Sequence, residues 1–447
     1  MVNFTEEKER AYQNSIVKMM RDVDGLAYTY LGSFLYAKGE KSKSDGTQNS
    51  NIIEGEMRAY LRDSGYTQMQ IEVALHELLE KAALPSGKFA DLLECNAAFY
   101  NLLVAGTKAQ PSADKPEEDV MFIDFAHPER NRFAFAEEVS YIDPMTGSHS
   151  RPDIVVYVNG IALCVIELKR SLVTIDEGIR QCLSNERDLI PSFFTTVQFT
   201  VAANPKKNNG KSENTGFKYA TVGTPQKFWC NWKDDGQKAG TQLTDAASFL
   251  RFFDKETFLF LVRYGVVSDA GTKKVMRPHQ FHALRVCRDR LADKASGVIW
   301  HSQGSGKSLT MVWLASYIRS NFPDPRVLVI TDRTELDAQI KRNFQHANIT
   351  PYRAESKSDL LKVLNGGTEW LICSLIHKFG VNPGTDERDR SSVKIPLDKY
   401  LEELKEIIRK EYPHGFSVKG KNLFVFVDEC HRTQGGSLHA AMREIMG

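Results

Sequence analysis

A glycine-rich loop is the first feature of this sequence that could do chemistry. The apolar run 298–300 predicts a short strand, the segment 301–308 (HSQGSGKS) a tight turn, and the apolar spacing over 309–319 a helix. Glycines let backbone N–H groups approach a phosphate, and the N-terminus of the next helix favours negative charge. In such a loop Lys307 reaches the β- and γ-phosphates, and the Ser308 hydroxyl binds Mg²⁺. The expected nucleotide contacts are Gly304, Ser305, Gly306, Lys307 and Ser308.

An acidic tetrad is expected to complete the nucleotide site. Residues 423–427 form an apolar run that predicts a buried strand, and the tetrad 428–431 (DECH) follows it. An acid at the C-terminal end of such a strand lies at the mouth of a parallel sheet, beside the phosphate loop. We expect Asp428 to hold Mg²⁺ through water and Glu429 to polarise the water that attacks the γ-phosphate. His301 replaces the first glycine of the simplest loop pattern, which leaves a ligand-free turn as the alternative, but the tetrad favours a nucleotidase.

A predicted hairpin brings a second set of reactive side chains together. The apolar runs 154–158 and 161–166 flank an Asn-Gly dipeptide, which favours a type I′ turn. Counting back across a two-residue loop places Asp153 opposite Ile166, within one residue of Glu167. Strict alternation would then put the two carboxylates on opposite faces. We therefore expect an irregularity, either a bulge at Asp153 or its placement at the mouth of the strand.

This hairpin has the residue types of a metal-dependent phosphodiesterase. Glu167 and Lys169 are two apart on one strand and share a face. Two carboxylates, from Asp153 and Glu167, can hold Mg²⁺ and orient a hydroxide, while Lys169 positions the water and offsets charge on the phosphate. The alternative is that these are ordinary charges at a turn and a strand end. Their presence in one chain with a nucleotide site favours the catalytic interpretation.

The elements that must position these residues divide the chain into regions. A chain of 447 residues exceeds the size at which one hydrophobic core keeps growing, so two or three domains are expected. The pattern is helical before Gly106 and strand-like over 120–201, with 120–125 among the clearest runs. After about Met276, apolar runs alternate with helical stretches, which is typical of a parallel sheet covered on both faces. The predicted class is α/β.

Composition limits the classes of function. The net charge is +1, so contact with nucleic acid would depend on local clusters of charge rather than on an overall basic balance. The candidate DNA-facing residues are Lys206, Lys207, Lys211, Lys273, Lys274, Lys341 and Arg342. Seven cysteines without a C-x-x-C pair predict reduced thiols, with neither a zinc site nor disulfides. The absence of a signal sequence or a long apolar stretch predicts a soluble intracellular protein.

The C-terminal motifs resemble those of superfamily-2 helicase motors. The resemblance rests on the loop 301–308, the tetrad 428–431 and the segment 326–339 (RVLVITDRTELDAQ). It implies one RecA-like lobe, with Gln280 as a contact to adenine. It also implies that 374–379 (SLIHKF) lies along the nucleic-acid track.

The N-terminal half resembles the restriction (motor) subunit of type I restriction enzymes. The segment 151–169 (RPDIVVYVNGIALCVIELK) is the most specific part of the resemblance. Further matching positions are Tyr30-Leu31-Gly32, Asn51-Ile52-Ile53-Glu54, Gln181, Pro191, Phe193-Phe194, Gly223-Thr224 and Phe228-Trp229. The resemblance implies a PD-(D/E)xK nuclease site in which Gln181 joins the three hairpin residues. Asn185 departs from the family, which often has Tyr there, and Glu54 is either a further acid or a solvated helix residue.

Together these resemblances imply a domain order and a function. They place an N-terminal helical region of the nuclease domain at 1–110, an endonuclease core at 111–265 and the first RecA-like lobe at 266–447, without the second lobe. They imply ATP- and Mg²⁺-dependent translocation on double-stranded DNA and cleavage of unmodified foreign DNA. The partners would be methyltransferase and specificity subunits, in a bacterial or archaeal cytoplasm. This chain alone is expected to hydrolyse ATP poorly.

Two other functions remain open at this stage. One is a stand-alone helicase-nuclease of DNA repair, which would act without the methyltransferase and specificity subunits. The other is a non-enzymatic one, in which the hairpin has decayed into a DNA-docking module, and Asn185 is its only support.

Overall fold

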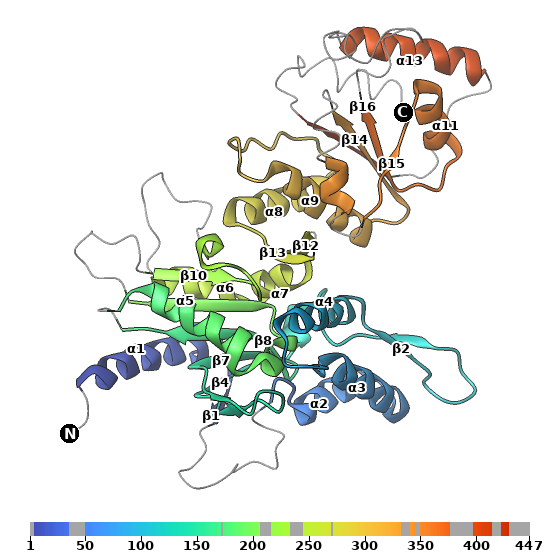
Figure 1. The fold of residues 1–447 in the computed structure, drawn as a ribbon. Helices are drawn as coiled ribbons and strands as arrows, with labels where there is room; N and C mark the ends of the chain where they lie inside the picture. The colour runs from blue at the N-terminus through green and yellow to red at the C-terminus, as the bar shows by residue number, and fades with distance from the viewer. Residues whose placement is uncertain are drawn as a thin grey trace. The chain divides into compact units, whose positions relative to one another are not determined.

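The computed structural model has a mixed α/β fold in two compact units, Met1–His282 and Ala283–Gly447 (Figure 1). Each unit is described by itself. The residues that the structure describes are 4–34, 50–170, 173–205, 216–232, 245–269, 271–331, 340–345, 349–375, 397–413 and 422–428.

The first unit is built around a seven-stranded sheet. Its strands are β1 (Thr29–Ser33), β4 (Phe133–Glu137), β7 (Ile154–Val158), β8 (Ile161–Leu168), β9 (Phe199–Asn204), β10 (Gly216–Ala220) and β11 (Cys230–Asn231), in that spatial order. β4, β7 and β8 are antiparallel neighbours, and β9 runs parallel to β8. Every residue of β4, β7, β8 and β9 is buried, which explains their continuous apolar runs.

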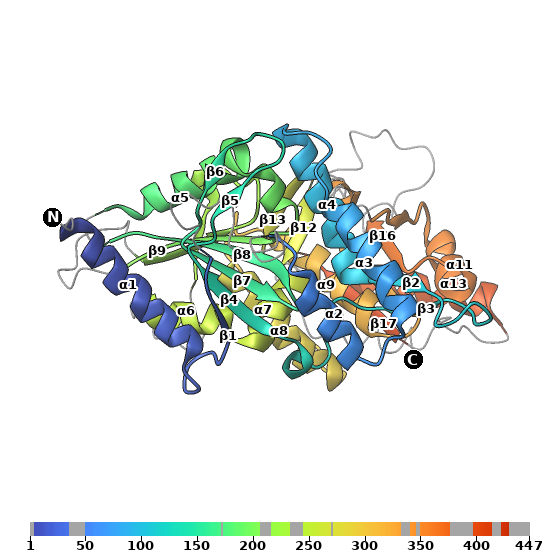
Figure 2. The ribbon, with the colours of Figure 1, turned by 90° about the horizontal axis from the view of Figure 1, so that it is seen from below.

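Helices cover both faces of this sheet. α5 (Ile175–Ser184) lies on one side, and α6 (Asp245–Phe253) and α7 (Lys255–Tyr264) lie on the other (Figure 2). On β9, Ala202 packs with the apolar residues of α5. Three positions earlier, the ring of Phe199 lies 5.6 Å from that of Phe252 and 5.8 Å from that of Phe258. Because alternate residues of a strand point to opposite faces, the sheet is the middle layer of three.

Amphipathic helices make up most of the N-terminal region, as the sequence predicts. They are α1 (Phe4–Arg21), α2 (Glu54–Asp63), α3 (Gln68–Ala82) and α4 (Phe89–Ala105). Most apolar residues expected to face the core from these helices are buried, whereas Val73 and Leu79, also expected there, are exposed; the buried ones are Met57, Tyr60, Leu61, Ile71, Ala74, Leu75 and Leu78. Short elements complete the unit: β2 (Thr107–Ala109), β3 (Glu118–Val120), β5 (Tyr141–Ile142), β6 (His149–Ser150), a π-helix (Asn185–Leu189), β12 (Val266–Asp269) and β13 (Thr272–Val275), with three 3-10 turns at Pro128–Arg130, Pro191–Thr195 and Gln226–Phe228. α8 (Pro278–Ala292) begins in this unit.

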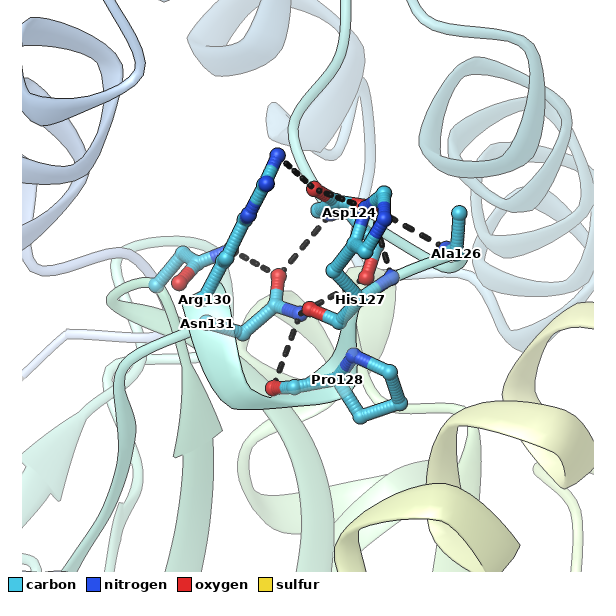
Figure 3. Close-up of polar contacts among 7 residues, drawn as sticks. Asp124, Ala126, His127, Pro128, Arg130 and Asn131 are labelled. Atoms are coloured by element: carbon cyan, nitrogen blue, oxygen red, sulfur yellow. Dashed lines mark hydrogen bonds and ion pairs between the residues drawn. The ribbon is translucent and has the colours of Figure 1, made fainter.

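A polar turn replaces most of the expected strand at 120–125. β3 already ends at Val120, because the next backbone groups bond to side chains instead of to a neighbouring strand. The side chain of Asn131 accepts the N–H of Asp124 at 2.9 Å and donates to the Asp124 carbonyl at 2.7 Å (Figure 3). The Asp124 carboxylate in turn accepts the N–H of His127 at 2.9 Å. Oδ1 of Asn131 also accepts a hydrogen bond from Nδ2 of Asn159 at 2.9 Å, so this turn is bonded to the turn of the β7–β8 hairpin.

The second unit contains the expected parallel sheet. Its strands are β14 (Pro325–Thr331), β15 (Tyr352–Arg353), β16 (Leu371–Leu375) and β17 (Asn422–Val427), and their spatial order is β15-β16-β14-β17, with parallel pairing throughout. The helices are α9 (Lys307–Asn321), α11 (Lys357–Gly366) and α13 (Leu397–Glu411). The strand expected at 298–300 is not formed, and Trp300 is 91% exposed. Among the strands described in this unit none pairs with it, so its backbone has no ladder to join.

Lys273 on β13 is buried, and this predicts a pH-dependent stability. Its amino group donates to the amide oxygens of Asn96 at 2.5 Å and Gln198 at 2.6 Å, and burial lowers its pKa to about 7. Between pH 7 and pH 10 this lysine is therefore protonated in the unfolded chain and neutral in the folded one. Because the unfolded chain binds one more proton than the folded chain in this window, the free energy of unfolding rises by about 1.4 kcal/mol per pH unit.

Lys273→Met is expected to remove that slope. The measurement is urea unfolding of the chain at pH 7, 8 and 9, compared with Lys274→Met, which changes the half-exposed neighbour. Parallel stability curves for the wild type and Lys273→Met would contradict this account of the buried lysine.

Candidate nuclease and nucleotide sites

The turn between β7 and β8 forms as predicted. Asn159 and Gly160 both have positive φ angles, 52° and 82°, as a type I′ turn requires. A Cβ atom on Gly160 would lie 2.5 Å from the carbonyl oxygen of Ile53, so only glycine fits at the second position.

A bulge in β8 changes the register of this hairpin. Ile154, not Asp153, lies opposite Ile166, so the predicted pairing is wrong by one residue. The extra residue is Leu163, because the register shifts where Val156 pairs with Cys164 and Tyr157 with Ala162. The next position outward brings Asp153 opposite Glu167. The expected irregularity therefore exists, but it lies within β8 and not at Asp153.

The two carboxylates form a buried pair with few partners. Glu167 is fully buried, and its Oε1 accepts the Nδ2 amide of Asn185 at 2.9 Å. Within the described part of the chain, no hydrogen-bond donor reaches the buried Oε2. Asp153 accepts the N–H of Leu168 at 2.7 Å through Oδ2. The two carboxyl groups also make a side-chain hydrogen bond with each other, which requires a proton on one of them, and with both groups charged the pair is costly unless a cation or a water is bound.

The surroundings of this pair disfavour negative charge. Burial raises the pKa of Glu167 well above its ordinary value, the charge of Asp153 raises it further, and Lys169 opposes both. Burial also raises the pKa of Asp153, against the opposing effects of Lys169 and of the Leu168 N–H. Two carboxylates of this kind at one end of a sheet are typical of a functional site rather than of a stabilising ion pair.

The residues present fit a divalent cation such as Mg²⁺. Mg²⁺ commonly keeps several waters and is bound through only one or two carboxylates. The unpartnered Oε2 of Glu167 and the carboxylate of Asp153 supply such a pair. Among the described side chains, no group of three or more His, Cys, Asp or Glu residues could hold a metal ion. The remaining ligands would thus have to be water, substrate or backbone oxygens.

Of the other predicted residues of the hairpin site, Lys169 and Gln181 lie on segments next to this pair, whereas Glu54 lies beside Gly160 at the turn end of the hairpin, away from both carboxylates. Lys169 directly follows β8, and its amino group donates to the Leu168 carbonyl at 3.0 Å. Gln181 lies on α5 and is half-buried, one turn before Asn185. Glu54 is the first residue of α2 and is also half-buried.

Sequence reasoning missed Glu138. It follows β4, is buried, and has a positive φ of 52°, which is unfavourable for a residue with a side chain. Its negative charge raises the pKa of both Asp153 and Glu167. Ion pairs with Arg10 at 3.2 Å and Arg151 at 2.7 Å hold it in place. Its sequence signal was weak, since it is the second of two acidic residues that follow the apolar run 133–136.

The glycine loop of the second unit has the backbone of a phosphate-binding turn. Gly304 and Gly306 have positive φ angles of 77° and 89°, and α9 begins directly afterwards at Lys307. The amino group of Lys307 lies 3.4 Å from the His301 carbonyl. Ser308 is half-buried in the first turn of α9. Ser305 lies between the two glycines, and its hydroxyl and its N–H both donate to the Ser302 carbonyl.

The acidic side of the nucleotide site is described only in part. Asp428 follows β17 and is half-buried, and its N–H donates to the Ile330 carbonyl of β14 at 3.0 Å. It thus stands at the C-terminal end of its strand, as predicted. Glu429 and the rest of the tetrad lie outside the described residues.

Two other expectations concern residues near the start of α8. Gln280 is 3% exposed in the first turn of α8, within the first unit, and its Oε1 accepts the Arg277 N–H at 2.9 Å. Its contact with adenine stays a prediction. The expectation that Lys273 faces DNA is wrong, because its amino group is buried and donates to the side-chain amides of Asn96 and Gln198.

Several predicted segments have no described structure. Segments 332–339 and 376–379 lie outside the described residues, as do Lys206, Lys207 and Lys211. None of the helices in the described part of the chain combines the length and the apolar character needed to cross a membrane.

Comparison with known families gives one match for each unit. Residues 8–210 match the family described as "Type I restriction enzyme R protein N terminus", and residues 279–447 match the SWI2/SNF2 ATPase family. The first match spans α1 to α5 and the hairpin site, and the second spans the glycine loop and Asp428. The resemblance stated from the motifs is confirmed.

Curated relatives are similar over most of this chain. The type I restriction enzyme SsaAORF53P endonuclease subunit of Staphylococcus saprophyticus is 24% identical over 89% of the chain and 41% of its own length. The HindI endonuclease subunit of Haemophilus influenzae is 26% identical over 77% of the chain and 32% of its own length. The putative MjaVIIIP endonuclease subunit of Methanocaldococcus jannaschii is 27% identical over 73% and 31%. The chain thus spans less than half the length of these relatives.

Proposed function

We propose that this chain, in which a type I restriction enzyme R protein N-terminal region precedes a SWI2/SNF2 ATPase region, couples ATP hydrolysis to translocation on DNA and to double-strand cleavage. Its target is unmodified foreign DNA. The observation that carries the proposal is the buried pair of Asp153 and Glu167 beside Lys169, with an unpartnered carboxylate oxygen, in one chain with a glycine loop that opens a helix.

The nuclease site is of the PD-(D/E)xK type in this proposal. The order β4, β7, β8, α5, β9, with β8 and β9 parallel, supports it, because one end of the sheet then carries the carboxylates and the lysine together. Asp153 and Glu167 would hold Mg²⁺, which when bound supplies an acidified water and charge compensation. Lys169 orients the attacking water and stabilises charge on the phosphate, and Gln181 on α5 contacts the substrate side of the site.

The nucleotide site follows the same division of roles. The N–H groups of the loop around Ser305, the glycines and the start of α9 bind the phosphates, and Lys307 neutralises their charge. Ser308 and Asp428 would hold Mg²⁺, which would offset the charge of the phosphates, and Glu429 would orient the attacking water. These assignments are proposals that the positive φ of both glycines and the start of α9 at Lys307 support.

The partners and the compartment follow from the same proposal. The chain would act on double-stranded DNA together with methyltransferase and specificity subunits, in the cytoplasm of a bacterium or an archaeon. Six cysteines among the described residues are free thiols, which suits a reducing compartment.

Reconstitution tests the proposed function. A protein that carries this sequence together with a second RecA-like lobe, combined with methyltransferase and specificity subunits, is expected to linearise an unmodified plasmid only when ATP and Mg²⁺ are both present. The same plasmid, methylated beforehand by the complex, should survive. Equal cleavage of both plasmids would contradict a restriction function, and efficient cleavage by the chain without the other subunits would support a stand-alone helicase-nuclease instead.

A further inference from the structure

The residue that follows α5 bridges two parts of the nuclease site. Asn185 is fully buried and opens the π-helix Asn185–Leu189, in which its carbonyl accepts the N–H of Ile190 at 2.9 Å. Its Nδ2 donates to Oε1 of Glu167 at 2.9 Å. Its Oδ1 accepts the hydroxyl of Ser150, on β6, at 2.6 Å.

Both ends of this amide are therefore engaged, and their chemistry fixes its orientation. The Ser150 hydroxyl can donate or accept, so Glu167 sets the orientation: its carboxylate accepts from Nδ2, and Ser150 then donates to Oδ1. A carboxylate accepts but cannot donate, so the reverse orientation would put two acceptors together at Glu167. A tyrosine at this position, as the resemblance would place there, has a single hydroxyl and no separate amide ends for the two partners.

This contact decides which oxygen of Glu167 stays available. With Oε1 held by Asn185, the oxygen without a described partner is Oε2. Rotation of the Glu167 side chain would break the bond to Asn185 and leave its buried amide donor unsatisfied, which is unfavourable. The amide therefore opposes any turn of the carboxylate away from the position it shares with Asp153.

We propose that Asn185 is a positioning residue of the nuclease site, which presents Oε2 of Glu167 to a divalent cation bound between Glu167 and Asp153. The inference rests on the proposed nuclease function. It goes beyond that function because it assigns a positioning role to Asn185, a position at which this sequence departs from the family. Ser150 supports this role because its hydroxyl donates to Oδ1 of Asn185 and so helps to hold the amide in place. Neither residue touches the cation or the DNA.

The test measures binding of Mn²⁺ to the full chain without nucleotide, by electron paramagnetic resonance. Asn185→Ala is expected to weaken binding at the nuclease site roughly tenfold to a hundredfold, as loss of an outer partner of a metal ligand does. Ser150→Ala should weaken it less, in the same direction. Asn101→Ala, which changes an exposed asparagine on α4, is the matched control and should bind like the wild type.

A second readout separates positioning from damage to the fold. In the assembled complex, the cleavage defect of Asn185→Ala should shrink as Mg²⁺ is raised, because excess metal compensates for a poorly placed ligand. Mn²⁺ affinity within twofold of the control for both Asn185→Ala and Ser150→Ala would overturn the proposal, and so would a defect of equal size at every Mg²⁺ concentration. If Asn185→Ala does not fold, as circular dichroism would show, Ser150→Ala decides alone.

The proposed nuclease function and the proposed role of Asn185 can be contradicted separately. A wild-type complex that cleaves no DNA while the Mn²⁺ affinities follow the expected order would contradict the nuclease function and leave the positioning role standing. A wild-type complex that cleaves DNA while the variants bind Mn²⁺ normally would contradict only the role of Asn185.

Discussion

Replacing Glu167 with Gln is expected to stop DNA cleavage by the assembled complex while ATP hydrolysis continues. Gln keeps the shape of the side chain and an oxygen for Asn185, but it removes the charge and the oxygen offered to the cation. Metal stabilisation of a phosphoryl transition state is worth several kcal/mol, and about 4 kcal/mol corresponds to roughly a thousandfold in rate. The measurement is conversion of supercoiled plasmid to linear DNA, with DNA-stimulated ATP hydrolysis followed in the same samples.

The loss cannot be attributed to unfolding. Burial and the charge of Asp153 raise the pKa of Glu167, so its surroundings disfavour the charged form of this side chain. The neutral amide removes that cost, and the variant should be at least as stable as the wild type. Glu177→Gln changes an exposed acid on α5 and should cleave normally. Cleavage by Glu167→Gln at the wild-type rate would exclude the proposed site, and a parallel loss of ATP hydrolysis would indicate general damage.

The sequence predicted this hairpin well because its signals are local. The Asn-Gly dipeptide and the two apolar runs predicted the turn and both strands, and Asn159 and Gly160 adopt the expected positive φ angles. The bulge at Leu163 has no such signal. Its carbonyl accepts the N–H of Gln198, which comes from a distant part of the chain, so a tertiary contact sets the register. Alternation alone therefore misplaced Asp153 by one residue.

The closeness of Glu138 and Asn185 to the two carboxylates has no local sequence signal either, although the resemblance already singles out Asn185. Glu138 is brought to the site by a left-handed backbone, and Asn185 by a π-helix, and neither conformation has a reliable sequence pattern.

The prediction of a strand at 298–300 was wrong for a different reason. An apolar run predicts that a segment can be buried in a sheet, but a strand forms only where a neighbouring strand offers its edge. Three of the four described strands of the second unit, β14, β16 and β17, lie on apolar runs of four or five residues, whereas the two-residue β15, at the edge of the sheet, has no apolar run.

Replacing Lys307 with Ala is expected to lower ATP hydrolysis roughly a hundredfold or more and to abolish cleavage that depends on ATP. Lys307 is the first residue of α9, directly after Gly306, so its charge adds to that of the loop N–H groups around the phosphates. Loss of one preorganised group of this kind commonly costs about 10²–10³ in rate. The measurement is phosphate release from ATP with and without DNA, beside plasmid cleavage by the same complex.

This variant separates the two sites, because it removes the motor and leaves the nuclease intact. Lys307→Ala should bind Mn²⁺ at Asp153 and Glu167 like the wild type, since those residues belong to the other compact unit. Lys362→Ala, an exposed lysine on α11, should retain both ATP hydrolysis and cleavage. If Lys307→Ala still hydrolysed ATP at the wild-type rate, the glycine loop would not be the nucleotide site. If it cleaved unmodified DNA at the wild-type rate, cleavage would not depend on the motor, and the coupling that joins the two units into one function would be wrong.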